Sequence, residues 1–144
     1  MDGYTIRKAT LEDVQKVHAW LKQEHEAGIE GCFLSKFSLI EKGQTTGSLT
    51  VVVRDSDSLP VAFCLGENNL ELLAVKADCR KQGLGRYLAE HFVKDAHSRN
   101  IIGLHGECSP RSSKPFWRAI GFHSVSDPSG SEKAWVALPY VARP

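Results

Sequence analysis

The sequence predicts a mixed α/β fold in which a β-sheet is flanked by helices. Short apolar or β-branched runs alternate with stretches of helical periodicity, in the order β-α-α-β-β-β-α-β-α-β-β. The chain has 144 residues, enough to bury one core, and it contains no internal repeat, low-complexity tract or linker. We therefore expect a single domain over residues 1–144.

Seven segments have the apolar or β-branched character of strands, and polar or glycine-rich turns separate them. They span residues 4–8, 49–54, 60–65, 70–75, 101–107, 122–125 and 134–141. A short polar turn joins the second and third segments, so we expect these two to form a hairpin.

The first two helices are expected between the first and second strands. Thr10 and Asp13 resemble a capping box that opens a helix ending before Gly28. A second, weaker helix is expected over residues 36–42, and glycines 43 and 47 should break it.

The last helix is expected to be short. Ser112 or Ser109 can cap it, and Gly121 should stop it. It carries Phe116 and Trp117 on its apolar side.

The stretch from Leu70 to Leu88 carries the clearest functional signal. It predicts a central strand, a polar turn and a helix, and the apolar stripe of that helix comprises Leu84, Leu88, Phe92 and Ala96. Gly83 and Gly85 fall where the loop becomes the helix, and a side chain there would hold a phosphate away from the free N–H groups. Such a helix start binds phosphate. Three cations flank it: Arg80, Lys81 and Arg86.

A connecting loop with turn glycines and a solvated basic face would give the same pattern. The motifs around this stretch therefore decide between a plain loop and a phosphate-binding site. A dinucleotide-binding fingerprint would require a third glycine where Leu88 stands, and the P-loop pattern does not occur in the chain.

Residues 80–85 match the (Gln/Arg)-x-x-G-x-(G/A) acyl-CoA signature, and they follow a strand with the sequence Leu-Ala-Val. The chain therefore resembles the GNAT superfamily of N-acetyltransferases. Residues 116–122 resemble the second signature of that family, which is an aromatic residue, tyrosine, three residues and Gly-Phe. Together the two signatures cover residues 70–122.

This resemblance implies a GNAT-like fold, a single mixed, largely antiparallel sheet that is splayed at its central strands. It also implies acetyl-CoA as the cosubstrate. The loop amides from Gln82 to Arg86 would hold the pyrophosphate, and the backbone of Leu73 and Val75 would pair with pantetheine as an extra strand. The cofactor-binding residues expected on this basis are Leu73, Ala74, Val75, Arg80, Lys81, Gln82, Gly83, Leu84, Gly85, Arg86, Ser109 and Phe116.

Acetyl transfer to an amine requires a base, because an alkyl amine with a pKa near about 10 is protonated at neutral pH. Asn69 and Glu71 share one face of the central strand, and both align with positions where relatives carry catalytic side chains. Only Glu71 can accept a proton, so we predict it as the general base. A solvated or ion-paired carboxylate is the alternative interpretation, and Glu67 is the second candidate.

Two positions depart from the family pattern. Trp117 stands where relatives often carry the tyrosine that protonates the departing CoA thiolate, and an indole N–H has no useful acidity. Trp117 is therefore expected to pack in the core, which leaves Ser109, Tyr140, solvent, or departure of the thiolate itself. Pro110 stands where many relatives carry an asparagine that contacts pantetheine.

Composition excludes several other classes of protein. A net charge of +1 argues against a nucleic-acid partner held by bulk charge. The four cysteines are widely spaced and the six histidines show no ligand spacing, so no metal site or disulfide framework is indicated. No apolar run approaches the roughly 20 residues of a membrane span, and there is no apolar leader. We expect a cytoplasmic protein with no membrane partner, and monomer and homodimer both stay open.

We predict an N-acetyltransferase that moves an acetyl group from acetyl-CoA to a primary amine of a small molecule or peptide, by direct transfer in a ternary complex. The alternative is a catalytically inactive acyl-CoA-binding module that acts as a sensor or partner domain. No motif identifies the acceptor, which is expected between residues 25–33 and the last strands. Glu24, Glu26 and Glu30 crowd this region and favour a cationic acceptor.

Overall fold

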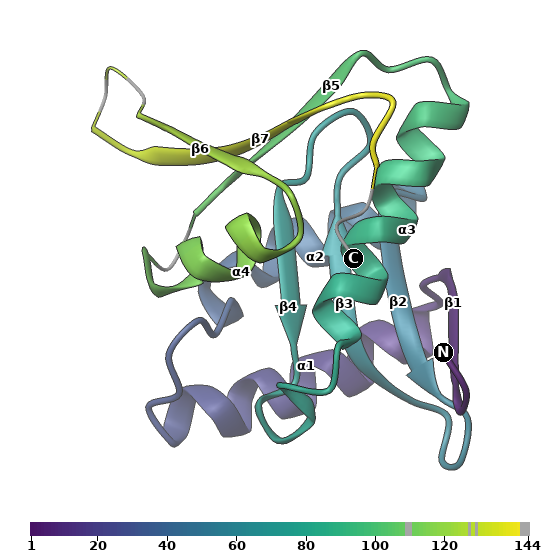
Figure 1. Cartoon of the computed structure of the whole chain (residues 1–144). Coiled ribbons are helices and arrows are strands. Elements are labelled where there is room, and N and C mark those ends of the chain that lie inside the picture. Colours follow the sequence, from purple (N-terminus) through teal and green to yellow (C-terminus); the bar gives the residue numbers. More distant parts are fainter. Residues whose placement is uncertain (109–110, 127, 129, 142–144) are drawn as a thin grey trace.

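The computed structural model describes residues 1–108, 111–126, 128 and 130–141, and it confirms the predicted order of strands and helices (Figure 1). The strands are β1 (Tyr4–Lys8), β2 (Leu49–Arg54), β3 (Leu59–Leu65), β4 (Leu72–Val75), β5 (Gly103–Glu107), β6 (His123–Ser126) and β7 (Glu132–Ala137). The helices are α1 (Leu11–Glu26), α2 (Phe37–Thr46), α3 (Leu84–Ser98) and α4 (Lys114–Ala119). Three short 3₁₀ turns are η1 (Leu34–Lys36), η2 (Ala77–Cys79) and η3 (Arg111–Ser113).

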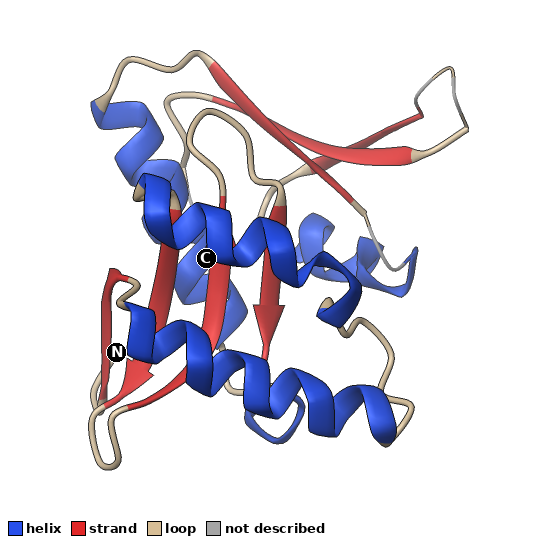
Figure 2. Cartoon of the chain, turned by 180° about the vertical axis from the view of Figure 1, so that it is seen from behind, coloured by secondary structure: helices blue, strands red, loops and turns tan. Residues whose placement is uncertain are grey.

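Strands β1 to β4 form an antiparallel sheet in chain order, with helices on both faces (Figures 1 and 2). Helices α1 and α2 cover one face, where Val51 and Phe63 are buried. Helix α3 covers the other face, where Val52 and Cys64 are buried. Because successive side chains of a strand point to opposite faces, a sheet covered on both sides needs continuous apolar runs. This explains why β2 and β3 show no polar alternation.

The predicted capping box at the start of α1 is present. Asp13 N donates to Thr10 Oγ1 at 3.2 Å, and Thr10 N donates to Asp13 Oδ2 at 2.8 Å. The Asp13 carboxylate is buried and also pairs with Arg7 of β1. Burial raises the pKa of Asp13, but the hydrogen bonds from Arg7 and Thr10 outweigh it and hold that pKa below its usual range.

The sheet divides at Glu71. Leu70 N donates to His105 O at 3.0 Å, whereas the next amide, Glu71 N, donates to Leu65 O at 2.8 Å. The backbone therefore changes its partner from β5 to β3 within one residue. Strands β5, β7 and β6 form a second antiparallel sheet, and within the described residues one parallel bridge, Leu70 with Gly106, joins it to the first. The predicted splay of the central strands is present and divides the sheet in two.

Several predicted boundaries are wrong. The central strand begins at Leu72 rather than at residue 70 because of this change of partner. Helix α2 continues through Gly43 and ends at Gly47, which has a φ of +77°. A Cβ on Gly43 would lie 2.2 Å from Leu65 Cδ1, so this glycine allows α2 to pack closely and does not end the helix.

The second half of the chain also differs in detail from the prediction. Strand β5 begins at Gly103, and Ile102 before it is 85% exposed. Strand β7 ends at Ala137, ahead of Pro139, which cannot donate to a ladder. At the start of α4 the N-cap is Ser113, and it makes no side-chain capping bond.

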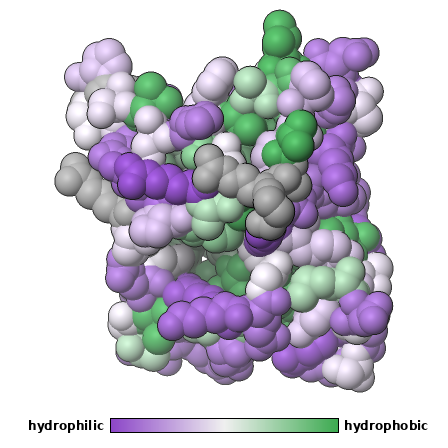
Figure 3. All heavy atoms as spheres, in the orientation of Figure 1, coloured by the Kyte–Doolittle hydropathy of each residue, from purple (hydrophilic) through white to green (hydrophobic). Residues whose placement is uncertain are grey.

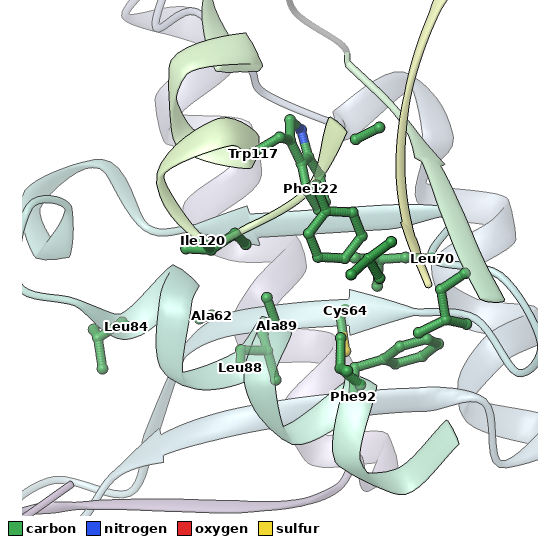
Figure 4. Close-up of a cluster of buried hydrophobic side chains, with 14 of the residues drawn as sticks. Ala62, Cys64, Leu70, Leu84, Leu88, Ala89, Phe92, Trp117, Ile120 and Phe122 are labelled. Atoms are coloured by element: carbon green, nitrogen blue, oxygen red, sulfur yellow. The ribbon is translucent and has the colours of Figure 1, made fainter. Parts of the chain in front are cut away.

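Buried apolar side chains fill the space between α3 and the sheet (Figure 4). The predicted stripe of α3 is buried there: Leu84, Leu88, Phe92 and Ala96. Trp117 of α4 reaches the same cluster, where its ring centroid lies 5.3 Å from that of Phe116 and 5.1 Å from that of Phe122. Only 5% of Trp117 is exposed, so it packs in the core as predicted.

Among the residues that the structure describes, none of the helices combines the length and apolar character that a membrane span requires. In the same part of the chain, no group of three or more His, Cys, Asp or Glu side chains is arranged to hold a metal ion. All four cysteines are free thiols: Cys32, Cys64, Cys79 and Cys108.

Candidate active site

The turn between β4 and α3 presents free backbone N–H groups. Gly83 is the N-cap of α3 and has a φ of +84°, which glycine adopts without strain. The bond from Tyr87 N to Gly83 O, at 3.0 Å, closes the first turn, so the N–H groups of Leu84 and Gly85 precede it. Because α3 has 15 residues, the positive end of its dipole strengthens the attraction of these groups for an anion.

A cavity of about 460 Å³ lies against this helix start, and residues of β4, α3 and α4 line it. That volume is in the range of small-molecule sites. Figure 3 shows the same side of the molecule, where apolar surface in green lies among hydrophilic residues in purple. The predicted cofactor-binding residues that line the cavity are Leu73, Ala74, Val75, Arg80, Lys81, Gly83, Leu84, Gly85, Arg86 and Phe116.

Two predicted cofactor-binding residues are not in this set. Gln82 does not line the cavity, and its Oε1 accepts a hydrogen bond from the Tyr4 hydroxyl at 3.3 Å. Gln82 thus ties the loop to β1, and the predicted role of its backbone amide at the pyrophosphate stays a prediction. Ser109 lies outside the described residues.

Gly85 is explained by packing. A Cβ at this position would lie 3.0 Å from Phe116 Cε1 and 3.5 Å from Val75 Cγ2. The missing side chain therefore lets the Phe116 ring of α4 close against α3. Phe116 and Val75 therefore lie where a side chain at this position would lie, and the role of the Gly85 N–H in phosphate binding stays a prediction.

The open edge of β4 borders the cavity. Alternate residues of an antiparallel strand direct their backbone groups to the same neighbour. Lys76 N donates to Val61 O of β3 at 2.7 Å, so the N–H and C=O groups of Leu73 and Val75 point to the opposite edge. Within the described chain no strand pairs with that edge of β4. Arg80 Nε donates to Val75 O there, at 3.1 Å.

Cations surround the loop, as the sequence predicted. Arg80 also donates from Nη1 to Glu30 O at 3.3 Å. Arg86 Nε donates to Glu90 Oε1 at 2.9 Å, and this hydrogen bond raises the pKa of Arg86, which stays cationic. Lys81 has a φ of +64°, and its exposed side chain makes no hydrogen bond or ion pair with the residues described.

The three acidic residues near the end of α1, which the sequence predicts beside the acceptor, have different surroundings in the structure. Glu24 is buried, and its Oε2 accepts a hydrogen bond from Ala77 N at 3.1 Å, so it fixes the turn after β4. Glu30 lines the 460 Å³ cavity, and its Oε1 accepts a hydrogen bond from Ser112 Oγ at 2.6 Å. Glu26 is exposed at the end of α1. Glu24 and Glu30 therefore fix segments that border the larger cavity, and the preference for a cationic acceptor stays a prediction.

A smaller cavity of about 90 Å³ adjoins the first and contains the predicted base. Glu71 lines it together with Glu107 of β5 and Lys36 of η1. Four residues line both cavities and mark their junction: Phe33, Leu73, Ser113 and Phe116. Glu71 is exposed, and it lies at the point where the sheet divides.

The other acid and base candidates that the structure describes do not line either cavity. Glu67 and Asn69 lie in the turn before β4. The Tyr140 hydroxyl donates to Ile120 O at the end of α4. Of the candidates placed by the structure, Glu71 alone faces a cavity.

Sequence reasoning missed part of the larger cavity. Its additional lining residues are Glu30, Gly31, Phe33, Cys79, Ser112, Ser113, Ala119 and Ile120. Most belong to the loop between α1 and α2 or to the segment around α4, where no periodic pattern distinguishes a lining position. Burial raises the pKa of Cys79, so its thiol is neutral and serves as a packing group.

Comparison with known proteins gives one family. The family model "Acetyltransferase (GNAT) domain" matches residues 21–143. A GNAT-family acetyltransferase from Listeria monocytogenes superposes with a TM-score of 0.72 at 12% identity, covering 94% of this chain and 95% of that chain.

Two further structures carry more specific descriptions. PaiA N-acetyltransferase from Thermoplasma acidophilum, solved in complex with coenzyme A, gives a TM-score of 0.63 at 14% identity, covering 93% of this chain and 98% of that chain. The ribosomal-protein-S18-alanine N-acetyltransferase of Escherichia coli gives 0.65 at 19% identity, covering 94% and 93%. These likenesses establish a shared fold.

Proposed function

The chain belongs to the GNAT family of acetyltransferases, and from this premise we propose that it transfers an acetyl group from acetyl-CoA to a primary amine of a small molecule or peptide. Transfer is direct, in a ternary complex. The observation that carries the proposal is the 460 Å³ cavity, in which the free amides of α3, the cationic loop and the open edge of β4 meet. Free cysteines support a cytoplasmic location.

The residues present fit acetyl-CoA. The N–H groups of Leu84 and Gly85 suit the pyrophosphate, because the first N–H groups of a helix have no carbonyl partner within it. Backbone groups of Leu73 and Val75 suit the amides of pantetheine, which can pair with a strand edge as a peptide does. Acetyl-CoA supplies an activated acetyl group on sulfur.

The acceptor amine belongs in the smaller cavity. Its volume of about 90 Å³ admits a narrow arm such as an unbranched primary amine, since one water molecule occupies about 30 Å³ of the liquid. Glu71 takes a proton from the bound ammonium, directly or through one water, which leaves the neutral amine that attacks. The amine nitrogen then bonds to the acetyl carbon, the carbon–sulfur bond breaks, sulfur keeps the electron pair, and the nitrogen releases its second proton to water.

Ligand-induced stabilisation tests the cosubstrate. Acetyl-CoA at 100 times its dissociation constant should add about 2.7 kcal/mol to the free energy of unfolding, and the melting temperature should rise accordingly. An unchanged melting temperature at millimolar acetyl-CoA would contradict the proposal. Release of free CoA with a panel of amines then identifies the acceptor class.

A second function is an acyl-CoA-binding module without catalysis. The burial of Trp117, which provides no proton donor of useful acidity, favours it. Turnover separates the two functions, because only the enzyme releases CoA when an amine is added. Tight acetyl-CoA binding with no transfer across a broad amine panel would establish the module.

A further inference from the structure

Ser113 stands where the two cavities meet. It lines both of them, together with Leu73 and Phe116. Its Oγ is buried and has no hydrogen-bond partner in the part of the chain that the structure describes. Ser124 Oγ, in β6, is the other buried side-chain oxygen of this kind among the described residues, and Ser124 lines neither cavity.

A buried hydroxyl without a partner requires an explanation, because buried polar groups in proteins are almost always hydrogen-bonded. Capping of helix α4 does not explain the buried hydroxyl of Ser113. It occupies the N-cap position of α4, where a serine usually accepts a bond from a backbone amide, and it makes no such bond. The hydroxyl therefore contributes nothing to the start of its own helix.

The neighbouring hydroxyl groups already have partners. Ser112 Oγ donates to Glu30 Oε1, and the Tyr140 hydroxyl donates to Ile120 O. Trp117 lies one helical turn after Ser113, but it is buried against Phe116 and Phe122. Among these described hydroxyl groups, the one of Ser113 therefore remains able to donate a hydrogen bond to a ligand at the junction of the two cavities.

We propose that the Ser113 hydroxyl donates a hydrogen bond to the sulfur of CoA, and this inference rests on the proposed function. The pyrophosphate is assigned to the start of α3 and the acceptor to the cavity of Glu71, so the sulfur that carries the acetyl group belongs between them. That junction is the place of Ser113. Its hydroxyl reaches other staggered positions by rotation about one bond.

The chemistry decides what such a hydroxyl can do. When the carbon–sulfur bond breaks, negative charge develops on sulfur, and a hydrogen bond to that charge stabilises the leaving group. A thiol has a pKa of about 8.5, and an aliphatic hydroxyl is a far weaker acid, so no proton passes from Ser113 to the thiolate. Ser113 therefore acts as a hydrogen-bond donor, and the thiolate leaves as the anion.

Ser113→Ala tests the inference, with Ser124→Ala as the matched control. Affinities are measured by calorimetric titration with CoA and with desulfo-CoA, which lacks the sulfur. We expect Ser113→Ala to weaken CoA binding about two- to tenfold, the range for one neutral hydrogen bond, and to leave desulfo-CoA binding unchanged. Ser124→Ala should bind both ligands as the wild type does.

Stability of the ligand-free protein provides a second measurement. Removing an unpaired buried hydroxyl removes a desolvation cost, so both alanine variants should melt at or above the wild-type temperature. A lower melting temperature for Ser113→Ala would assign Ser113 a capping role and overturn the inference.

Wild-type CoA affinity in Ser113→Ala, or an equal loss with desulfo-CoA, would also overturn it. Failure of the wild-type protein to bind CoA at all would instead overturn the proposed function.

Discussion

Replacing Gly83 by alanine tests whether the loop before α3 holds the pyrophosphate, and Gly47→Ala is its matched control. Gly83 has a φ of +84°, and the nearest atom to an added Cβ is Met1 Cε at 4.0 Å. Gly47, at the end of α2, has a φ of +77° and no atom within 4 Å of that position. Both substitutions put an L side chain in the left-handed region without a clash, which costs about 1–2 kcal/mol. We expect the two variants to lose similar free energies of unfolding.

Only Gly83→Ala should weaken CoA binding, because Gly83 sets the direction of the amides that follow it and Gly47 lines neither cavity. Loss of one charge-assisted hydrogen bond costs about 1.5–3 kcal/mol, which lowers the affinity about 10- to 100-fold. Denaturant unfolding without ligand measures the free energy of unfolding of both variants, and calorimetric titration measures their affinity for CoA. Wild-type affinity in Gly83→Ala would refute the assignment of the pyrophosphate to this loop. An equal loss in Gly47→Ala would show that strain, and not position, weakens binding.

Two further predictions concern Glu71 and Asp13. Glu71→Gln should lower turnover about 100- to 10,000-fold at neutral pH, with a smaller loss at high pH, where the amine deprotonates unaided; a pH–rate profile within about threefold of the wild type would remove Glu71 from the mechanism. Because the pKa of Asp13 is lowered in the folded protein, its contribution to stability is present above the unfolded pKa of about 3.9 and is lost as the pH falls through the lower, folded value. Asp13→Asn should therefore lower the free energy of unfolding by about 1.5–3 kcal/mol at neutral pH and make it depend less on pH in acid. Urea unfolding at several pH values measures both effects. An unchanged free energy of unfolding at neutral pH would contradict this prediction.

The sequence predicted the strand, loop and helix from residue 70 to residue 88 because their signals are local. The stripe of α3 has helical spacing, and Gly83 stands at the position that requires a positive φ. The remainder of the cavity depends on contacts between distant segments. Glu30 accepts a hydrogen bond from Ser112, which lies 82 positions later in the chain. The residues next to them in the sequence do not predict this contact.

Gly85 and Ser113 also show that a local sequence pattern does not predict tertiary contacts. A glycine after a loop predicts a backbone role, but the structure places Phe116 against Gly85, and a pattern in the sequence does not reveal that partner. A serine before a short helix predicts a cap, yet Ser113 makes no capping bond. In both cases the local rule gives the common role of the residue type, whereas tertiary packing determines which contacts the residue makes.

The open edge of β4 requires a reason, because sheet edges inside a protein are normally paired or covered. Strand β5 is close enough to extend the sheet, since Leu70 and Gly106 already form a bridge, and a Cβ on Gly106 would lie 2.8 Å from Leu70 O. The chain instead directs Glu71 N to Leu65 O, and the strands separate.

Arg80 covers one group of that edge, the carbonyl of Val75. The Arg80 side chain is 38% exposed, so a ligand can displace it at small cost. An extended ligand with its own amides can then pair with Leu73 and Val75, as an added strand does. The binding of pantetheine at this edge would thus explain why the sheet divides. If the sheet had only a structural role, β5 could continue to pair with β4 beyond this bridge.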